Sequence, residues 1–352
     1  MDTAQFTPDR LTLLRERRGW SINTLAERSG VSVRSIRFYE SGEQKPGVAA
    51  VTRLALALNV PDSWFEGPPV SGLEIHAASF RAATKLPAYR RRSAISAGRL
   101  AMHFADWIGE RFELPPVEVP DLARAEPELA AELVRASWSL GNQPAPNMVH
   151  LLEAHGVLVF GLADDCRELD AFCFWRHGRP FVLLNTMKSG EHGRMDAAHE
   201  LAHLVLHRDV EVITRDHELE AMRFAGAFLM PPAAMAPYGG YPTLGEILMV
   251  KEAWQVAATA LVYRLHELGL IIDWHYRTLM VELSKRGYRR SEPNGIAREQ
   301  SQLLSRVLRY SREDGVGLRE IAQALGLFER EVVEFVLGLA LVSAVHLTAQ
   351  NE

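Results

Sequence analysis

The sequence feature that constrains this chain most is the pentapeptide His199-Glu200-Leu201-Ala202-His203. On an α-helix, residues i and i+4 lie on one face, so both imidazoles can reach the same ion. Glu200 lies beside them, where a carboxylate can take a proton from water. Zn²⁺ suits this arrangement, because its catalytic sites use three protein ligands and leave a fourth position for water. The motif predicts a helix over about 193–206 with His199 and His203 as zinc ligands and Glu200 as general base.

The alternative to a metal site is a chance match on an amphipathic helix. The preceding sequence favours the metal site, because it contains three short apolar runs bounded by Gly, Asp and Pro, as strands are. These runs cover residues 156–161, 171–175 and 181–185. We therefore expect a small β-sheet before the helix, and we expect the strand that ends at Leu184-Asn185 to hold an extended substrate by β-augmentation.

The third ligand must come from another segment. A second helix is predicted over 217–230, where Pro231-Pro232 stops it, and it offers Glu218 and Glu220. Glu218 shares a helix face with apolar residues and Glu220 shares one with Arg223, which favours Glu218 and leaves Glu220 open. His207, one turn beyond His203, is either a further ligand or, more simply, a packed residue behind the ligands.

A second motif lies near the N-terminus. Apolar spacing and helix caps predict two short helices, 21–29 and 32–40, joined by a Gly-Val-Ser turn. This is the helix-turn-helix pattern, whose second helix enters the major groove of DNA. Residues 10–60 hold nine Arg or Lys and four Glu, although the whole chain has a net charge of -5. A basic segment on an acidic protein indicates that this part binds a polyanion.

Five side chains of this motif are predicted to contact DNA. Arg34, Ser35 and Arg37 face outward from the second helix, and Arg is the usual reader of guanine edges. Ser32 and Lys45 are better positioned to contact phosphate. The alternative is a helical docking domain with a solvated charged face.

The remaining segments are predicted to be mainly helical. Residues 64–72, with Pro68-Pro69 and two glycines, have the composition of a linker. A further helix-turn-helix-like segment near the C-terminus has an acidic second helix over 328–337. Phosphate repels that charge, so we interpret this segment as a packing or dimerisation element.

Two observations bear on the compartment. Cys166 and Cys173 are too few for a disulfide framework or a cysteine-based zinc ribbon. Residues 1–10 lack the apolar core of a signal peptide, and the apolar stretch 332–347 is interrupted by Glu334 and too short to span a membrane. We expect a cytoplasmic protein that does not insert into a membrane.

These motifs resemble two known families. The sequence from Asp170 to His207, followed by Glu218-Leu-Glu-Ala and Leu229-Met-Pro, resembles the ImmA/IrrE-type metallopeptidases, zinc-dependent bacterial and phage regulators of the gluzincin kind that typically act on repressor proteins. Residues 11–65, with Gly30-Val-Ser-Val-Arg-Ser-Ile-Arg, resemble Cro/C1-type (XRE) helix-turn-helix domains. The first resemblance implies that Glu218 is the third ligand. The second implies that the protein binds a palindromic operator as a homodimer.

The expected fold is mainly α with a small β-sheet (α+β). The expected parts are a helix-turn-helix domain (1–67), a helical linker region (68–146), a gluzincin-like metallopeptidase domain (147–290) and a helical C-terminal region (291–352).

The expected function is that of a DNA-binding transcriptional regulator, active in stress response, whose zinc metallo-endopeptidase domain cleaves a repressor or regulatory protein. One Zn²⁺ per chain is held by His199, His203 and Glu218, and the partners are an operator in double-stranded DNA, the protein substrate and a second copy of the chain. The alternative is a non-catalytic repressor or antitoxin whose metal site is structural or senses an effector.

Overall fold

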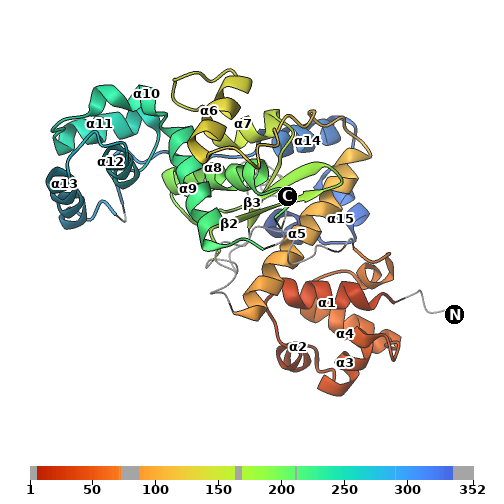
Figure 1. The fold of residues 1–352 in the computed structure, drawn as a ribbon. Coiled ribbons are helices and arrows are strands. Elements are labelled where there is room, and N and C mark those ends of the chain that lie inside the picture. The colour runs from red at the N-terminus through yellow and green to blue at the C-terminus, as the bar shows by residue number, and fades with distance from the viewer. Residues whose placement is uncertain are drawn as a thin grey trace, which may run out of the picture.

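The computed structural model describes residues 6–70, 72, 87–162, 169–210, 212–289 and 291–335. Cys166 and most of the apolar stretch 332–347 lie outside these residues. The described chain is mainly helical with one small sheet, which confirms the expected fold class (Figure 1). None of the helices in these ranges combines the length and the apolar character needed to cross a membrane.

Besides a short 3₁₀ helix at Asp62–Glu66 and another at Ala236–Tyr238, the helices are α1 (Pro8–Arg17), α2 (Ile22–Ser29), α3 (Val33–Ser41), α4 (Val48–Leu58), α5 (Ala88–Gly109), α6 (Pro127–Ser137), α7 (Met148–Ala154), α8 (Gly190–Leu206), α9 (Arg215–Leu229), α10 (Pro232–Met235), α11 (Leu244–Trp254), α12 (Ala258–Glu267), α13 (Asp273–Lys285), α14 (Gln302–Glu313), α15 (Leu318–Leu325) and α16 (Glu329–Phe335).

The caps predicted for the helix-turn-helix are present. The Ser21 hydroxyl accepts a hydrogen bond from the Thr24 N–H at the start of α2, and the Ser32 hydroxyl accepts one from the Ser35 N–H at the start of α3, both at 3.0 Å. Gly30 ends α2 with φ +66°, a left-handed conformation that glycine adopts without strain. The local sequence therefore fixes where α2 ends and α3 begins.

The start of the predicted linker is wrong. Trp64 and Phe65 lie in the 3₁₀ helix Asp62–Glu66 and are fully buried in the core of the N-terminal domain. The Trp64 indole N–H donates to the Arg10 carbonyl at 3.1 Å, and the Arg10 guanidinium donates to the Trp64 and Pro68 carbonyls. Proline and glycine content indicated a linker, but the two aromatic side chains bury too much apolar surface to be left in solvent.

Within the described residues, three strands form the sheet, as predicted. They are β1 (Leu158–Leu162), β2 (Ala171–Arg176) and β3 (Arg179–Asn185), in the order β1-β3-β2. β1 runs parallel to β3, and β2 pairs with β3 as an antiparallel hairpin. The hairpin turns through His177 and Gly178, both with positive φ, as a two-residue turn of this kind requires.

The expected docking strand is wrong, because β3 lies in the middle of this sheet. Both of its edges are already hydrogen-bonded, to β1 on one side and to β2 on the other. A peptide cannot add to a strand that has no unpaired edge. Among the described strands, β2 is an edge strand and lies against α8, where the Cys173 thiol approaches the Glu200 carbonyl at 3.5 Å.

The sheet is buried on both faces, and alternate residues point to different layers. One face, which includes Phe160, Phe174 and Phe181, packs against α5 and forms one core with the helix-turn-helix domain. The other face, which includes Cys173 and Val182, packs against α8, and α9 packs against α8 in the same core. α5 contacts both α1 and β1, so it joins the N-terminal domain to the sheet (Figure 1).

The C-terminal helices pack against this junction. The His103 ring on α5 is 3.2 Å from the Leu325 carbonyl at the end of α15. The buried Glu331 carboxylate of α16 accepts hydrogen bonds from Arg18 at 2.9 Å and from Asn59 at 2.6 Å, just after α1 and α4. The acidic segment is thus a packing element in this chain. α10–α13 form a separate lobe beside α9 (Figure 1).

Candidate metal centre and nucleic-acid interface

The two histidines of the motif are fixed by the burial of α8. Ser189 caps the helix, and its hydroxyl accepts from the His192 N–H. Small and branched apolar residues around the motif, such as Ala198 and Leu201, pack into the core between the sheet and α9. His199 and His203 are both buried, and their Nε2 atoms lie 3.1 Å apart. The i, i+4 spacing therefore aims both imidazoles at one point, as predicted.

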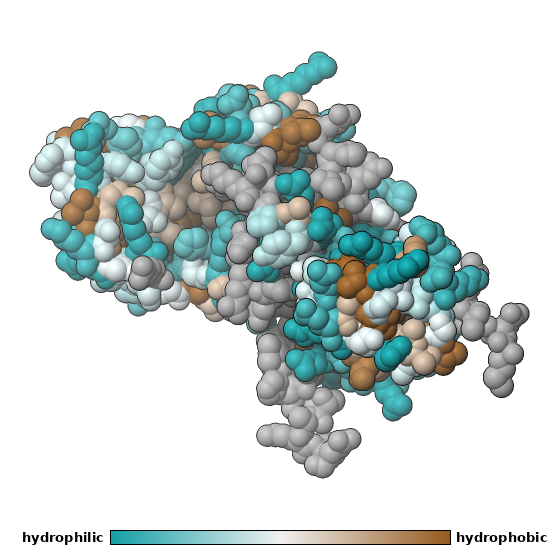
Figure 2. All heavy atoms as spheres, turned by 90° about the horizontal axis from the view of Figure 1, so that it is seen from below, coloured by the Kyte–Doolittle hydropathy of each residue, from teal (hydrophilic) through white to brown (hydrophobic). Residues whose placement is uncertain are grey.

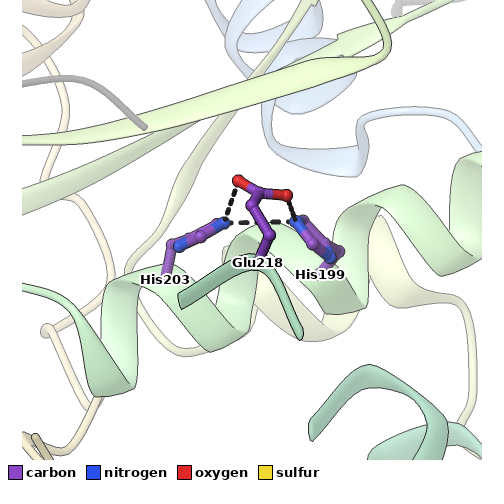
Figure 3. A group of neighbouring side chains, drawn as sticks. All are labelled: His199, His203 and Glu218. Atoms are coloured by element: carbon purple, nitrogen blue, oxygen red, sulfur yellow. Dashed lines mark hydrogen bonds and ion pairs between the residues drawn. The ribbon is translucent and has the colours of Figure 1, made fainter. Parts of the chain in front are cut away.

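Glu218 completes this cluster from α9. Thr214 caps α9 through a reciprocal pair of hydrogen bonds with His217, and Glu218 follows directly. One carboxylate oxygen of Glu218 is 3.4 Å from His199 Nε2, and the other is 3.5 Å from His203 Nε2 (Figure 3). Of the two carboxylates that the sequence left open, Glu218 is the one beside these histidines.

The separations allow one zinc ion to contact all three side chains. With ligand bonds of about 2.05 Å, neighbouring ligand atoms at tetrahedral angles lie about 3.3 Å apart. The two Nε2 atoms are 3.1 Å apart, and each lies 3.4 or 3.5 Å from a different oxygen of Glu218, so that with one ligand atom from each residue the three atoms lie within 4.8 Å of one another. Two imidazoles and one carboxylate are also a donor set that zinc prefers, and three ligands leave one tetrahedral position open. The described residues contain this one group of three suitable side chains.

Electrostatics at the cluster favour the ligating form of Glu218. Burial opposes its ionisation, but hydrogen bonds and charge from His199 and His203 outweigh burial and lower its pKa to about 2. Burial lowers the pKa of His207 and so favours its neutral ring, although the hydrogen bond that His207 donates to Glu220 acts in the opposite direction. A neutral imidazole and an ionised carboxylate are the forms that coordinate metal ions.

Glu200 lies on α8 between the two histidines and is buried. Its backbone carbonyl faces β2 through the Cys173 contact. This contact packs the backbone of the motif against the edge strand β2.

Sequence reasoning missed the position of Glu220. Its carboxylate is 2.8 Å from His207 Nε2, and His207 Nδ1 is 2.9 Å from His203 Nδ1. The repeated i, i+4 spacing of His199, His203 and His207 was the available signal for the third histidine. Nothing in the sequence marked the partner of that histidine, because it comes from a different helix.

The predicted DNA-contacting side chains lie on α3, at its N-cap and in the segment that follows it. Ser32, Arg34, Arg37 and Lys45 are exposed, and Ser35 is half-buried, with its hydroxyl 2.8 Å from the Ser32 hydroxyl. Arg34 and Arg37 extend from α3, whose buried Ile36 anchors the opposite side of the helix in the core. Seen from below, this end of the molecule is covered mainly by hydrophilic side chains with hydrophobic patches between them (Figure 2).

Comparison with known proteins agrees with both sites. Residues 11–65 match the helix-turn-helix family, and residues 152–266 match the IrrE N-terminal-like domain of a metallopeptidase family. The chain carries both domains. The histidine cluster, β1–β3, α8 and α9 all lie within the second match, which supports a metal at the cluster.

A curated relative is the HTH-type transcriptional regulator SutR of Escherichia coli (strain K12). It is 44% identical to this chain over 68 residues, which are 19% of this chain. The matched part covers 38% of that relative's own length.

Proposed function

We propose that this protein is a DNA-binding transcriptional regulator whose second domain is a zinc-dependent peptidase. The observation that carries the proposal is the convergence of two histidines of a His-Glu-x-x-His helix and one glutamate of α9, whose ligand atoms lie within 4.8 Å of one another. A helix-turn-helix with exposed arginines on the same chain supports the regulatory part. One Zn²⁺ per chain, held by His199, His203 and Glu218, agrees with this donor set.

The catalytic chemistry follows from the residues around that position. A divalent cation bound there supplies Lewis acidity that polarises a carbonyl and acidifies water. Glu200 is the general base: it takes the proton of the attacking water and returns it to the leaving amine. Burial of the cluster keeps bulk water away, which strengthens each of these electrostatic interactions.

The substrate strand is better assigned to β2 than to β3. β2 lies at an edge of the described sheet, and its Cys173 contacts the backbone of α8 at Glu200, so an extended peptide paired with β2 would lie close to the helix that carries the histidines. Such pairing recognises backbone, and side-chain pockets then select the sequence. A repressor or regulatory protein with an accessible extended segment is the substrate class that we propose, and release of repression under stress is the outcome.

The DNA-binding part acts on a double-stranded operator. Arg34 and Arg37 contact base edges, and Ser32, Ser35 and Lys45 contact the backbone or neighbouring bases. Val48 and Leu56 of α4 are 71% and 81% exposed, and burying them against a second copy agrees with the homodimer that a palindromic site requires. We place this regulator in the cytoplasm, where it meets DNA.

The test is Glu200→Gln as the sole gene copy, compared with wild type and with Glu313→Gln, whose side chain on α14 is 61% exposed. Glu200→Gln removes the base but no ligand, so metal content and operator occupancy stay normal. Cleavage falls about 100-fold or more, and the target genes fail to switch. Sequencing of new N-termini in the cell's proteins, with transcript analysis, measures both effects.

Two results would refute the peptidase proposal. If Glu200→Gln switches its genes as well as wild type, catalysis is dispensable and the metal site is structural. If switching is lost although wild type yields no cleavage product, the cleft senses an effector, as in the non-catalytic alternative.

A further inference from the structure

A hydrogen-bonded chain extends from the cluster through a third imidazole. His207 is the C-cap residue that directly follows α8, and it is buried. Its Nδ1 lies 2.9 Å from His203 Nδ1, and its Nε2 lies 2.8 Å from a carboxylate oxygen of Glu220 on α9. Glu218 and Glu220, two residues apart on one helix, thus contact different histidines of α8.

The Glu220 carboxylate, at the end of this series of hydrogen bonds, determines where the protons lie. An ionised carboxylate only accepts hydrogen bonds, so His207 carries its proton on Nε2 and donates it to Glu220. Metal binding through His203 Nε2 places the proton of that ring on Nδ1, which donates across 2.9 Å to His207 Nδ1. The lone pair of His203 is left on Nε2, the atom that lies 3.1 Å from His199 Nε2 and 3.5 Å from Glu218.

The opposite arrangement would block the cluster. If His203 carried its proton on Nε2, a hydrogen atom would point at the position where the three ligand atoms converge. The contacts of His207 with His203 and with Glu220 hold the His203 ring in the tautomer that carries its proton on Nδ1. They also fix the rotation of that ring about its Cβ–Cγ bond. Metal-bound histidines usually donate their second N–H directly to a carboxylate or a carbonyl, whereas here an imidazole lies between.

We propose that Glu220 and His207 are positioning residues that hold His203 in the orientation and tautomer required for metal binding. The proposal rests on the metal site proposed above. Glu220 acts only through His207, and neither residue touches the metal or the substrate. Partners of this kind contribute about 10-fold to 100-fold to metal affinity when they contact a ligand directly. Loss of His207 is therefore expected to weaken zinc binding at least tenfold.

The test measures zinc affinity of the full-length protein by competition with a chromogenic chelator. His207→Ala and Glu220→Ala are each expected to bind zinc about tenfold more weakly than wild type. The double variant is expected to match His207→Ala, because removing Glu220 has no further effect once His207 is gone. Asp216→Ala is the matched control: it removes an exposed carboxylate from the first turn of the same helix and leaves the affinity within about twofold.

Two further variants separate positioning from folding. Glu220→Gln retains an oxygen that accepts from His207, so it is expected to restore most of the affinity lost in Glu220→Ala. The Glu220 side chain is 45% exposed, so its removal leaves the fold intact even if His207→Ala proves unstable by circular dichroism. The visible spectrum of the Co²⁺-loaded protein is expected to change in Glu220→Ala and to return in Glu220→Gln.

The outcomes that overturn this proposal are distinct from failure of the metal site. Wild-type zinc affinity in Glu220→Ala, or additive losses of affinity in the double variant, would show that Glu220 and His207 do not act together on His203. Complete loss of zinc in Glu220→Ala with retention in Glu218→Ala would make Glu220 the ligand. By contrast, a wild-type protein that binds no divalent ion would refute the metal site itself.

Discussion

At the scale of single residues, the histidine cluster depends on the spacing of residues along α8 and on the way α9 crosses that helix. The relation of His199 to His203 follows from helix geometry, so the sequence predicted it without ambiguity. Glu218 and Glu220 both lie near the start of α9, and their separate partners depend on how α9 crosses α8. That crossing is set by packing of whole faces, which a local pattern does not encode.

The arginines of α3 give a prediction at this scale. Arg34→Ala and Arg37→Ala should each reduce discrimination between operator and unrelated DNA by about 1–3 kcal/mol while leaving non-specific binding. Lys45→Ala should instead weaken binding to all sequences and reduce the slope of log affinity against log salt by about one. Fluorescence anisotropy over a salt series measures both effects. Equal losses on operator and unrelated DNA for the arginine variants would show that they do not read bases.

At the scale of elements, the strands were predicted but their order was not. The apolar runs identified β1, β2 and β3, and both faces of each are buried as continuous apolar runs imply. The insertion of β3 between β1 and β2 depends on a parallel pairing over a long sequence separation. For that reason the sequence favoured the wrong strand for substrate docking.

The turn that leads into β1 gives a prediction about an element. Gly156 has φ +83°, and a Cβ there would lie 2.7 Å from the Val117 Cα, on a neighbouring backbone. Gly156→Ala should lower the free energy of unfolding by about 3 kcal/mol, because strain and overlap combine. Gly178→Ala is the control: φ is +76° but nothing lies within 4 Å of the added atom, so it should cost about 1 kcal/mol. Similar losses in urea unfolding for both variants would contradict the overlap.

At the scale of the whole molecule, the N-terminal domain is part of a shared core. Its apolar residues form one cluster with α5, one face of the sheet and α14–α16. The sequence showed two motifs and a polar, proline-rich segment between them, which suggested independent domains. The contacts of the C-terminal helices with Arg18 and Asn59 join residues more than 270 positions apart and had no sequence signal.

The C-terminal contact gives a prediction about the whole chain. Glu331→Ala removes two hydrogen bonds and leaves the Arg18 guanidinium partly buried, so the free energy of unfolding should fall by about 2 kcal/mol. Operator affinity should not change, because Arg18 and Asn59 lie outside α3. Glu329→Ala, an exposed residue of the same helix, is the control and should have almost no effect. Equal stability of the two variants would show that this contact does not hold the C-terminal helices in position.

The most direct test of the account is the metal content of the purified full-length protein, measured by mass spectrometry after dialysis. The account predicts about one Zn²⁺ per chain in wild type and almost none in His199→Ala, His203→Ala and Glu218→Ala. The Glu220→Ala variant should still contain about one Zn²⁺ per chain under these conditions, because a tenfold loss of zinc affinity leaves a tight site occupied. Full retention of zinc in both histidine variants, or retention in Glu218→Ala with loss in Glu220→Ala, would contradict the proposed centre.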